Sequence, residues 1–182
     1  QEVLALQRTA VQEIVPLYRQ LMERGQIELT TTPFFHPILP LVIDTDITRR
    51  ARPDLPLPAR FRAQEDAEAQ LREAVLFHQQ TFGQPPSGLW PSEGSVCPEM
   101  LPLVHQVGLH WLATDEGILA RSLAMDGLPW QRSSALYQPY HIGEAGQSLA
   151  ILFRDREISD AFGFIYHKTT PEAAAEDVTR RL

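Results

Sequence analysis

The segment WLATDEGIL, residues 111–119, carries the pattern that decides the fold. Its opening residues form a short, nearly continuous apolar run, which is typical of a parallel strand covered on both faces. Two acidic residues, Asp115 and Glu116, follow the run directly, and GILARSL, residues 117–123, has the composition of a helix. We therefore expect a strand at 110–114 that leads straight into a helix, the repeating unit of α/β proteins.

The same alternation extends along the chain in both directions. Helical spacing of apolar residues occurs at 2–24, 65–82 and 98–107, and β-branched or apolar runs occur at 26–32, 88–90 and 149–154. Pro16 is expected to kink or restart the first helix. Because strands that alternate with helices pair in parallel through right-handed crossovers, we predict either an open doubly wound sheet or a closed barrel. Sites in both folds lie at the carboxyl ends of the strands.

Two stretches interrupt the alternation. Residues 42–64 hold Pro53, Pro56 and Pro58, each of which lacks an amide donor for a central strand. We expect this stretch to be an irregular excursion near a cleft, within a single domain that covers residues 1–182. Residues 127–147 are also expected to be loop-like.

Composition narrows the function classes. The 182 residues include 23 acidic and 16 basic ones, for a net charge of −7, and no Lys or Arg run compensates locally. An acidic surface repels phosphate backbones, so nucleic acid is not an expected partner. No apolar run approaches the ~18–20 residues that span a membrane, so a membrane is not expected either. A single cysteine, Cys97, excludes an internal disulfide and a cysteine-based zinc cluster, and with no visible signal peptide we expect a cytoplasmic protein.

Charged residues lie within or just beyond four of the predicted strands. Glu28 interrupts the first, Glu93 follows the second, Asp115 follows the third, and Arg154 and Asp155 close the fourth. Two carboxyl groups that converge from different strands are what glycoside hydrolysis requires. Three plainer interpretations stay open: Asp115 caps a helix, Glu28 faces water from an edge strand, and the last two residues form a surface pair.

Four segments together resemble family 57 of the glycoside hydrolases, in that family's order. They are GQIELTTTPFFHPILPL (25–41), GLWPSEGSV (88–96), WLATDEGIL (111–119) and LFRDREISDAFGFIY (152–166), of which WPSEG and TDE are the most specific. The resemblance implies a (β/α)7-type parallel barrel, incomplete in this chain, and a retaining hydrolase or transglycosidase that acts on α-glucans such as starch, glycogen or maltooligosaccharides. The HPILPL continuation is most similar to the α-amylase and amylopullulanase branch.

The resemblance also implies residue roles. Glu93 would be the nucleophile and Asp115 the general acid/base, with their carboxyl groups near the ~5–5.5 Å typical of retaining pairs. Glu28, His36, Trp90 and Trp111 would bind substrate, the two tryptophans flanking the catalytic carboxylates. No metal or other cofactor is implied.

The sequence departs from the family at both ends. The His-Gln-Pro-like tripeptide of the family's first motif does not occur, and the helical region that completes the cleft has no counterpart. We therefore expect an internal slice of a catalytic barrel.

Two other functions stay in competition. A metal-dependent polysaccharide deacetylase would need histidines such as His105 and His110 on one ion, but Gly108 is expected to end the helix between them. A truncated barrel could also bind glucan without turnover.

Overall fold

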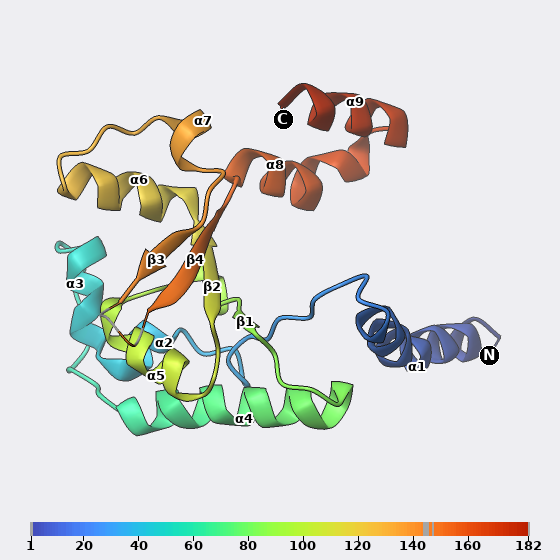
Figure 1. Cartoon of the computed structure of the whole chain (residues 1–182), viewed down its shortest axis with the longest axis horizontal. Coiled ribbons are helices and arrows are strands. Elements are labelled where there is room, and N and C mark those ends of the chain that lie inside the picture. Colours follow the sequence, from blue (N-terminus) through green and yellow to red (C-terminus); the bar gives the residue numbers. More distant parts are fainter. Residues whose placement is uncertain (1, 144–145, 147, 182) are drawn as a thin grey trace. The chain divides into compact units, whose positions relative to one another are not determined.

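The computed structural model describes residues 2–143, 146 and 148–181 (Figure 1). The chain divides into two compact units. The first comprises the chain up to Leu112 together with residues 141–150, and the second comprises residues 113–140 and the chain from Ile151 onward.

The sheet contains four strands: β1 (Gly88–Leu89), β2 (Trp111–Asp115), β3 (Tyr140–Ile142) and β4 (Leu149–Arg154). Their order is β1-β2-β4-β3, and Figure 1 shows β2, β4 and β3 side by side. β1 and β2 are parallel, with Gly88 opposite Trp111 and Leu89 opposite Leu112. The predicted α/β class and the parallel pairing of these two strands are therefore confirmed.

The first unit holds α1 (Glu2–Glu23), α2 (Leu39–Ile43), α3 (Thr48–Ala51), α4 (Gln64–Phe82) and α5 (Leu101–Gln106). Its core is apolar, and several members are fully buried on α4, the strands and the segments around α5: Leu71, Leu89, Met100, Leu109 and Leu112. Gly83 ends α4 as predicted, with φ at +86° and its amide donating to Gln79 O at 2.8 Å. Pro16 lies inside α1, which continues through it as one helix.

The predicted strand at 26–32 is wrong. The structure shows a single parallel bridge there, Thr31 with Leu89, and no longer ladder. The Thr31 amide donates to Gly88 O at 3.0 Å, and the Trp90 amide donates to Thr31 O at 2.8 Å. β1 has only two residues, so the β-branched run of 26–32 finds too few partners to continue the pairing.

The two stretches expected to be loops contain short elements of regular secondary structure. Residues 42–64 include a 3-10 turn at Thr45–Ile47 and the short helix α3, and no described residue of that stretch lies in a strand. Residues 127–147 contain α7 (Arg132–Ala135) and β3, both missed by the sequence pattern.

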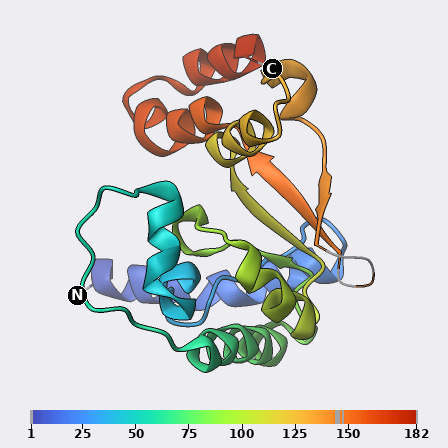
Figure 2. The same ribbon diagram turned by 90° about the vertical axis from the view of Figure 1, so that its left-hand side faces the viewer.

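The second unit holds α6 (Glu116–Met125), α7, α8 (Arg156–Asp160) and α9 (Pro171–Arg181), with helical turns between α8 and α9. Asp115 caps α6 by accepting from the Gly117 amide at 2.8 Å, and Asp155 caps α8 by accepting from the Ile158 amide at 2.9 Å. Figure 2 shows α6 and α8 close together at the ends of β2 and β4. The capping interpretation of Asp115 is therefore correct.

Candidate active site

Glu93 lies on a 3-10 turn, Ser92–Gly94, four residues after β1 ends. Its φ is +56°, a left-handed conformation that a residue with a Cβ seldom adopts, and its side chain is exposed. Its Oε1 lies 3.4 Å from Nε2 of His36, which itself has a φ of +58°. The structure therefore joins two of the predicted site residues through side chains presented from strained backbone.

The loop that carries His36 is held in place from several directions. The His36 amide donates to Pro33 O at 2.8 Å, and its Nδ1 lies 3.3 Å from the Thr32 hydroxyl. The preceding amide, of Phe35, donates to the Gln70 side chain on α4 at 2.8 Å. Both imidazole nitrogens thus have polar neighbours, which restricts the orientation of the ring.

Glu28 and Trp111 form a second pair of predicted site residues. The indole Nε1–H of Trp111 donates to Oε1 of Glu28 at 2.9 Å. Trp111 is the first residue of β2 and Asp115 the last, so they lie roughly 13 Å apart along an extended strand. The structure thus places Trp111 and Asp115 at the two ends of β2, and the substrate-binding role of Trp111 stays a prediction. Trp90 follows β1 directly and is 42% exposed, which leaves its ring available to a ligand.

Asp115 belongs to the second unit and is bound by two arginines there. Nε of Arg154 lies 3.0 Å and Nε of Arg156 3.2 Å from its Oδ2, and an Arg156 Nη2 contact reaches Oδ1. Burial raises the pKa of the carboxyl, but hydrogen bonds from Arg156 and the Gly117 amide and the charges of both arginines outweigh it. The pKa of Asp115 therefore lies below its ordinary value, and the group is ionised at neutral pH.

A glycine makes room for this ion pair. A Cβ on Gly117 would lie 2.6 Å from Nη2 of Arg156 and 3.0 Å from Oδ1 of Asp115. Any larger residue would displace the guanidinium that holds the carboxylate.

A network around Arg132 extends the cluster, and sequence reasoning missed it. Arg132 donates to Glu116 Oε2 at 2.9 Å and to Asp155 Oδ1 at 2.6 Å, and the Tyr137 hydroxyl donates to Asp155 Oδ2 at 2.6 Å. Asp155 is therefore bound to Arg132, and Arg154 to Asp115 and Asp160, rather than to each other. Arg132 lies 16 residues from one partner and 23 from the other, and no local pattern signals such a contact.

The described part of the chain contains neither a cluster of metal ligands nor a membrane-spanning helix. Within residues 2–143, 146 and 148–181, no three His, Cys, Asp or Glu side chains converge as an ion would require. No described helix has the length and apolar character of a membrane span. The predicted site residues supply several kinds of functional group. They are the exposed carboxylate of Glu93, the arginine-paired carboxylate of Asp115, the imidazole of His36, and the indole rings of Trp90 and Trp111.

Comparison with known proteins identifies relatives. The model of a family described as Glycosyl hydrolase family 57 matches residues 3–182. Alpha-amylase 1 of Dictyoglomus thermophilum is 25% identical over 96 residues, which are 53% of this chain and 11% of that protein.

Solved structures share the fold. A 4-alpha-glucanotransferase from Thermococcus litoralis matches 84% of this chain with a TM-score of 0.59 at 18% identity, and the match covers 20% of that chain. A branching enzyme from Thermococcus kodakaraensis matches 95% of this chain with a TM-score of 0.60 at 18% identity, over 33% of its own length. The chain thus spans between a tenth and a third of these relatives.

Proposed function

Because the chain belongs to glycosyl hydrolase family 57, we propose that it forms part of a retaining glycoside hydrolase or transglycosidase that acts on α-glucans. The relatives named above are an amylase, a glucanotransferase and a branching enzyme, and the last was solved in complex with glucose. Starch, glycogen and maltooligosaccharides are the substrates proposed for this chain. We place its strands within a (β/α)7 barrel.

The observation that carries the proposal is the presentation of Glu93. An ionised nucleophile must reach the anomeric carbon, and Glu93 is exposed on the turn after a parallel strand, where α/β enzymes place catalytic groups. Its left-handed backbone is strained, and such strain collects at functional sites.

In the proposed mechanism, a retaining enzyme uses its two carboxyl groups in succession. Glu93 attacks the anomeric carbon and forms a covalent glycosyl-enzyme, while Asp115 donates a proton to the leaving oxygen. In the second step Asp115 accepts a proton from water, or from the hydroxyl of an acceptor sugar, which then displaces Glu93. Hydrolysis and transfer differ only in that acceptor.

The arginine pair on Asp115 favours one of its two roles. An ionised carboxylate is ready to act as the base of the second step, whereas the first step needs the protonated acid. We propose that the contact from Arg156 is broken while a glucan occupies the site, because loss of that hydrogen bond and charge raises the pKa of Asp115.

We propose that Trp90 and His36 line the sugar site. Trp90 is partly exposed at the end of β1, and an indole face suits the apolar face of a glucosyl ring. His36 contacts the proposed nucleophile directly and can donate to a sugar hydroxyl from the same position.

Azide rescue tests this assignment. Glu93→Ala should lose turnover of an activated α-glucoside, and azide should restore part of it by attacking in place of the missing carboxylate, with a β-glucosyl azide as product because this single displacement inverts the anomeric carbon. Glu99→Ala is the matched control. Glu99 lies seven residues after the start of the 3-10 turn Ser92–Gly94, and its substitution should show no azide effect. Wild-type chain that binds maltooligosaccharides without any turnover would instead favour a non-catalytic glucan-binding function.

A further inference from the structure

The indole ring of Trp111 fills the space that a side chain at Gly88 would need. A Cβ built on Gly88 would lie 2.2 Å from Cε2, 2.3 Å from Cζ2 and 2.8 Å from Nε1 of Trp111. Gly88 has no positive φ, so its backbone accepts any residue, and the constraint is purely steric. The indole of Trp111 therefore lies directly against the backbone of the strand opposite, in the space that any other residue at 88 would fill.

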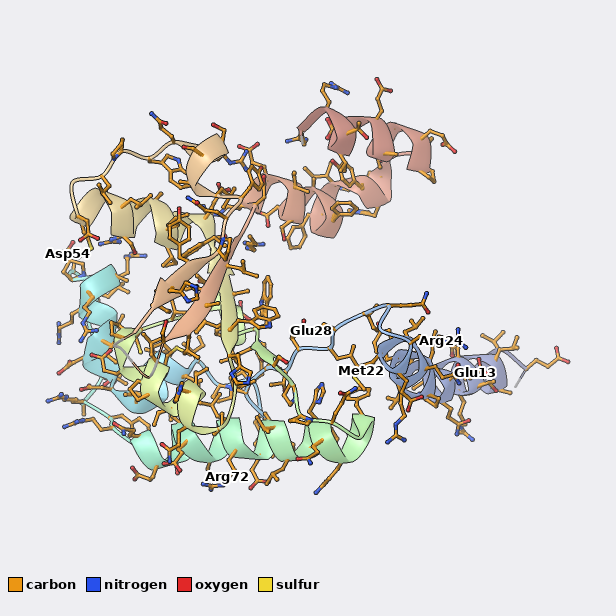
Figure 3. All side chains as sticks on the ribbon, viewed as in Figure 1. Glu13, Met22, Arg24, Glu28, Asp54 and Arg72 are labelled. Carbon is orange, nitrogen blue, oxygen red and sulfur yellow. The ribbon has the colours of Figure 1, made fainter. Side chains whose placement is uncertain are left out.

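The ring that rests on Gly88 also holds Glu28. Nε1 of Trp111, one of the atoms nearest to Gly88, donates to the Glu28 carboxylate at 2.9 Å. Figure 3 labels Glu28 on the extended segment that leads from α1 to the sheet. A shift of the indole by the width of a methyl group would break this hydrogen bond, since donors and acceptors must stay within about 3.2 Å.

The segment between Glu28 and His36 is attached to the sheet and its turn at three successive points. Glu28 is bound to Trp111 at the start of β2, Thr31 exchanges backbone hydrogen bonds with Gly88 and Trp90, and His36 contacts Glu93. Only seven residues lie between Glu28 and His36. All three contacts therefore lie along one short, mostly extended segment.

We infer that Gly88, Trp111 and Glu28 form a latch that positions His36 against Glu93. Glu28 is then a positioning residue and not a sugar ligand. The inference rests on the proposed function for the role of Glu93, and its own support is geometric. Trp111 opens β2 at the amino end of the strand, whereas substrate sites of parallel α/β folds lie beyond the carboxyl ends.

Indole signals in ¹H–¹⁵N NMR spectra test the latch without any need for activity. The chain has three tryptophans, so Trp111→Phe assigns the signal of Trp111 by its loss. Gly88→Ala and Glu28→Ala should both move that signal and speed its exchange with water, and both should also shift the imidazole signals of His36. Glu28→Gln keeps an oxygen acceptor and should leave both sets of signals close to wild type.

A matched control and a second variant separate the effect of the steric clash from a general effect on folding. Gly163→Ala adds the same methyl group where nothing lies within 4 Å, and it should change neither set of signals. If Gly88→Ala does not fold, the double variant with Trp111→Ala removes the ring that the new methyl group would meet and should match Trp111→Ala alone. An unmoved Trp111 signal in Glu28→Ala, or unmoved His36 signals in Trp111→Phe, would overturn the latch.

Steady-state kinetics separates positioning from sugar binding. Trp111→Phe and Glu28→Ala should lower kcat on maltooligosaccharides about tenfold or more with little change in KM, because displacement of a catalytic group by about 1 Å costs up to a hundredfold. Glu28→Gln should retain most of kcat. A raised KM at unchanged kcat, with no rescue by Gln, would show that Glu28 binds sugar and would overturn the inference. If wild-type chain turns over no α-glucan, the proposed function fails, and the NMR signals still decide whether the latch exists.

Discussion

His36 and Glu93 contact each other at 3.4 Å, from imidazole Nε2 to carboxylate Oε1, and both have a left-handed backbone. Among the described residues they are the two non-glycine positions with a positive φ. Each such conformation costs about 1–2 kcal/mol, so the fold accepts strain at both ends of one interaction. The two side chains lie 57 residues apart in the chain, and only the packed loops bring them together.

The strained backbone at Glu93 predicts that glycine is more stabilising than alanine at this position, the reverse of their order within a helix. Glu93→Gly should be more stable than Glu93→Ala by about 1 kcal/mol, because glycine adopts a φ of +56° without the Cβ penalty. That difference corresponds to about 2–4 °C in a thermal melt followed by circular dichroism. The reverse order is expected for a matched pair at Ala69 on α4, where wild-type alanine should exceed Ala69→Gly in the same melt. Equal stability of the two Glu93 variants would contradict a strained backbone.

The ion pair on Asp115 predicts a pH effect on turnover. Arg156→Met removes a hydrogen bond and a positive charge that lower the pKa of Asp115, so that pKa should rise. The limb of the kcat/KM profile that reports the protonated acid should then move to higher pH. Arg72→Met, which removes an exposed arginine paired with Glu68 on α4, should leave the profile in place. A limb that moves to lower pH in Arg156→Met would contradict the proposed role of Asp115.

The ion pair between Asp44 and Arg60 predicts that the free energy of unfolding depends on pH. The hydrogen bond from Arg60, at 3.0 Å from its Nε, lowers the pKa of Asp44 from 3.8 to about 2. A depressed native pKa stabilises the fold above the unfolded value of about 3.9, and this contribution is lost as the pH falls through about 2. The free energy of unfolding of wild type should therefore exceed that of Asp44→Asn above about pH 5, with the gap closing between about pH 4 and 2.

Urea titrations across that pH range measure the gap. Asparagine can still accept the Asp46 amide that Asp44 Oδ1 accepts at 3.0 Å, so the substitution removes mainly the charge. Asp54→Asn, at an exposed position, should follow wild type at every pH. A gap between wild type and Asp44→Asn that stays constant down to pH 2 would show that Arg60 does not stabilise the ionised form.

The leaving group predicts how Asp115→Asn behaves. Loss of the general acid should reduce turnover most on starch and maltooligosaccharides, whose leaving alcohols need a proton, and least on activated aryl glucosides. The measurement is the ratio of kcat/KM for the two substrate types in wild type and variant. Undiminished activity of Asp115→Asn on starch would remove Asp115 from the mechanism.

Local pattern alone determined much of the secondary structure. β4 begins and ends where LAILFR does, α4 ends at Gly83, and the strand–helix junction at Asp115 follows WLATDEGIL. These elements depend on side-chain periodicity and on a glycine or aspartate at a terminus. Both are properties of residues that are close together in the sequence. The residues 26–32 had comparable β-branched character and formed no strand, because pairing depends on the length of the partner strand and not on propensity.

The motifs selected Glu93 and Asp115, but only the tertiary structure decided what surrounds them. Arg156 reaches Asp115 across 41 residues, and Trp111 reaches Glu28 across 83. The sequence places Trp111 and Asp115 in one short motif, whereas an extended strand separates them by its whole length. Protonation state and side-chain orientation depend on such distant neighbours, because charges and hydrogen bonds act through space while a motif records only distance along the chain.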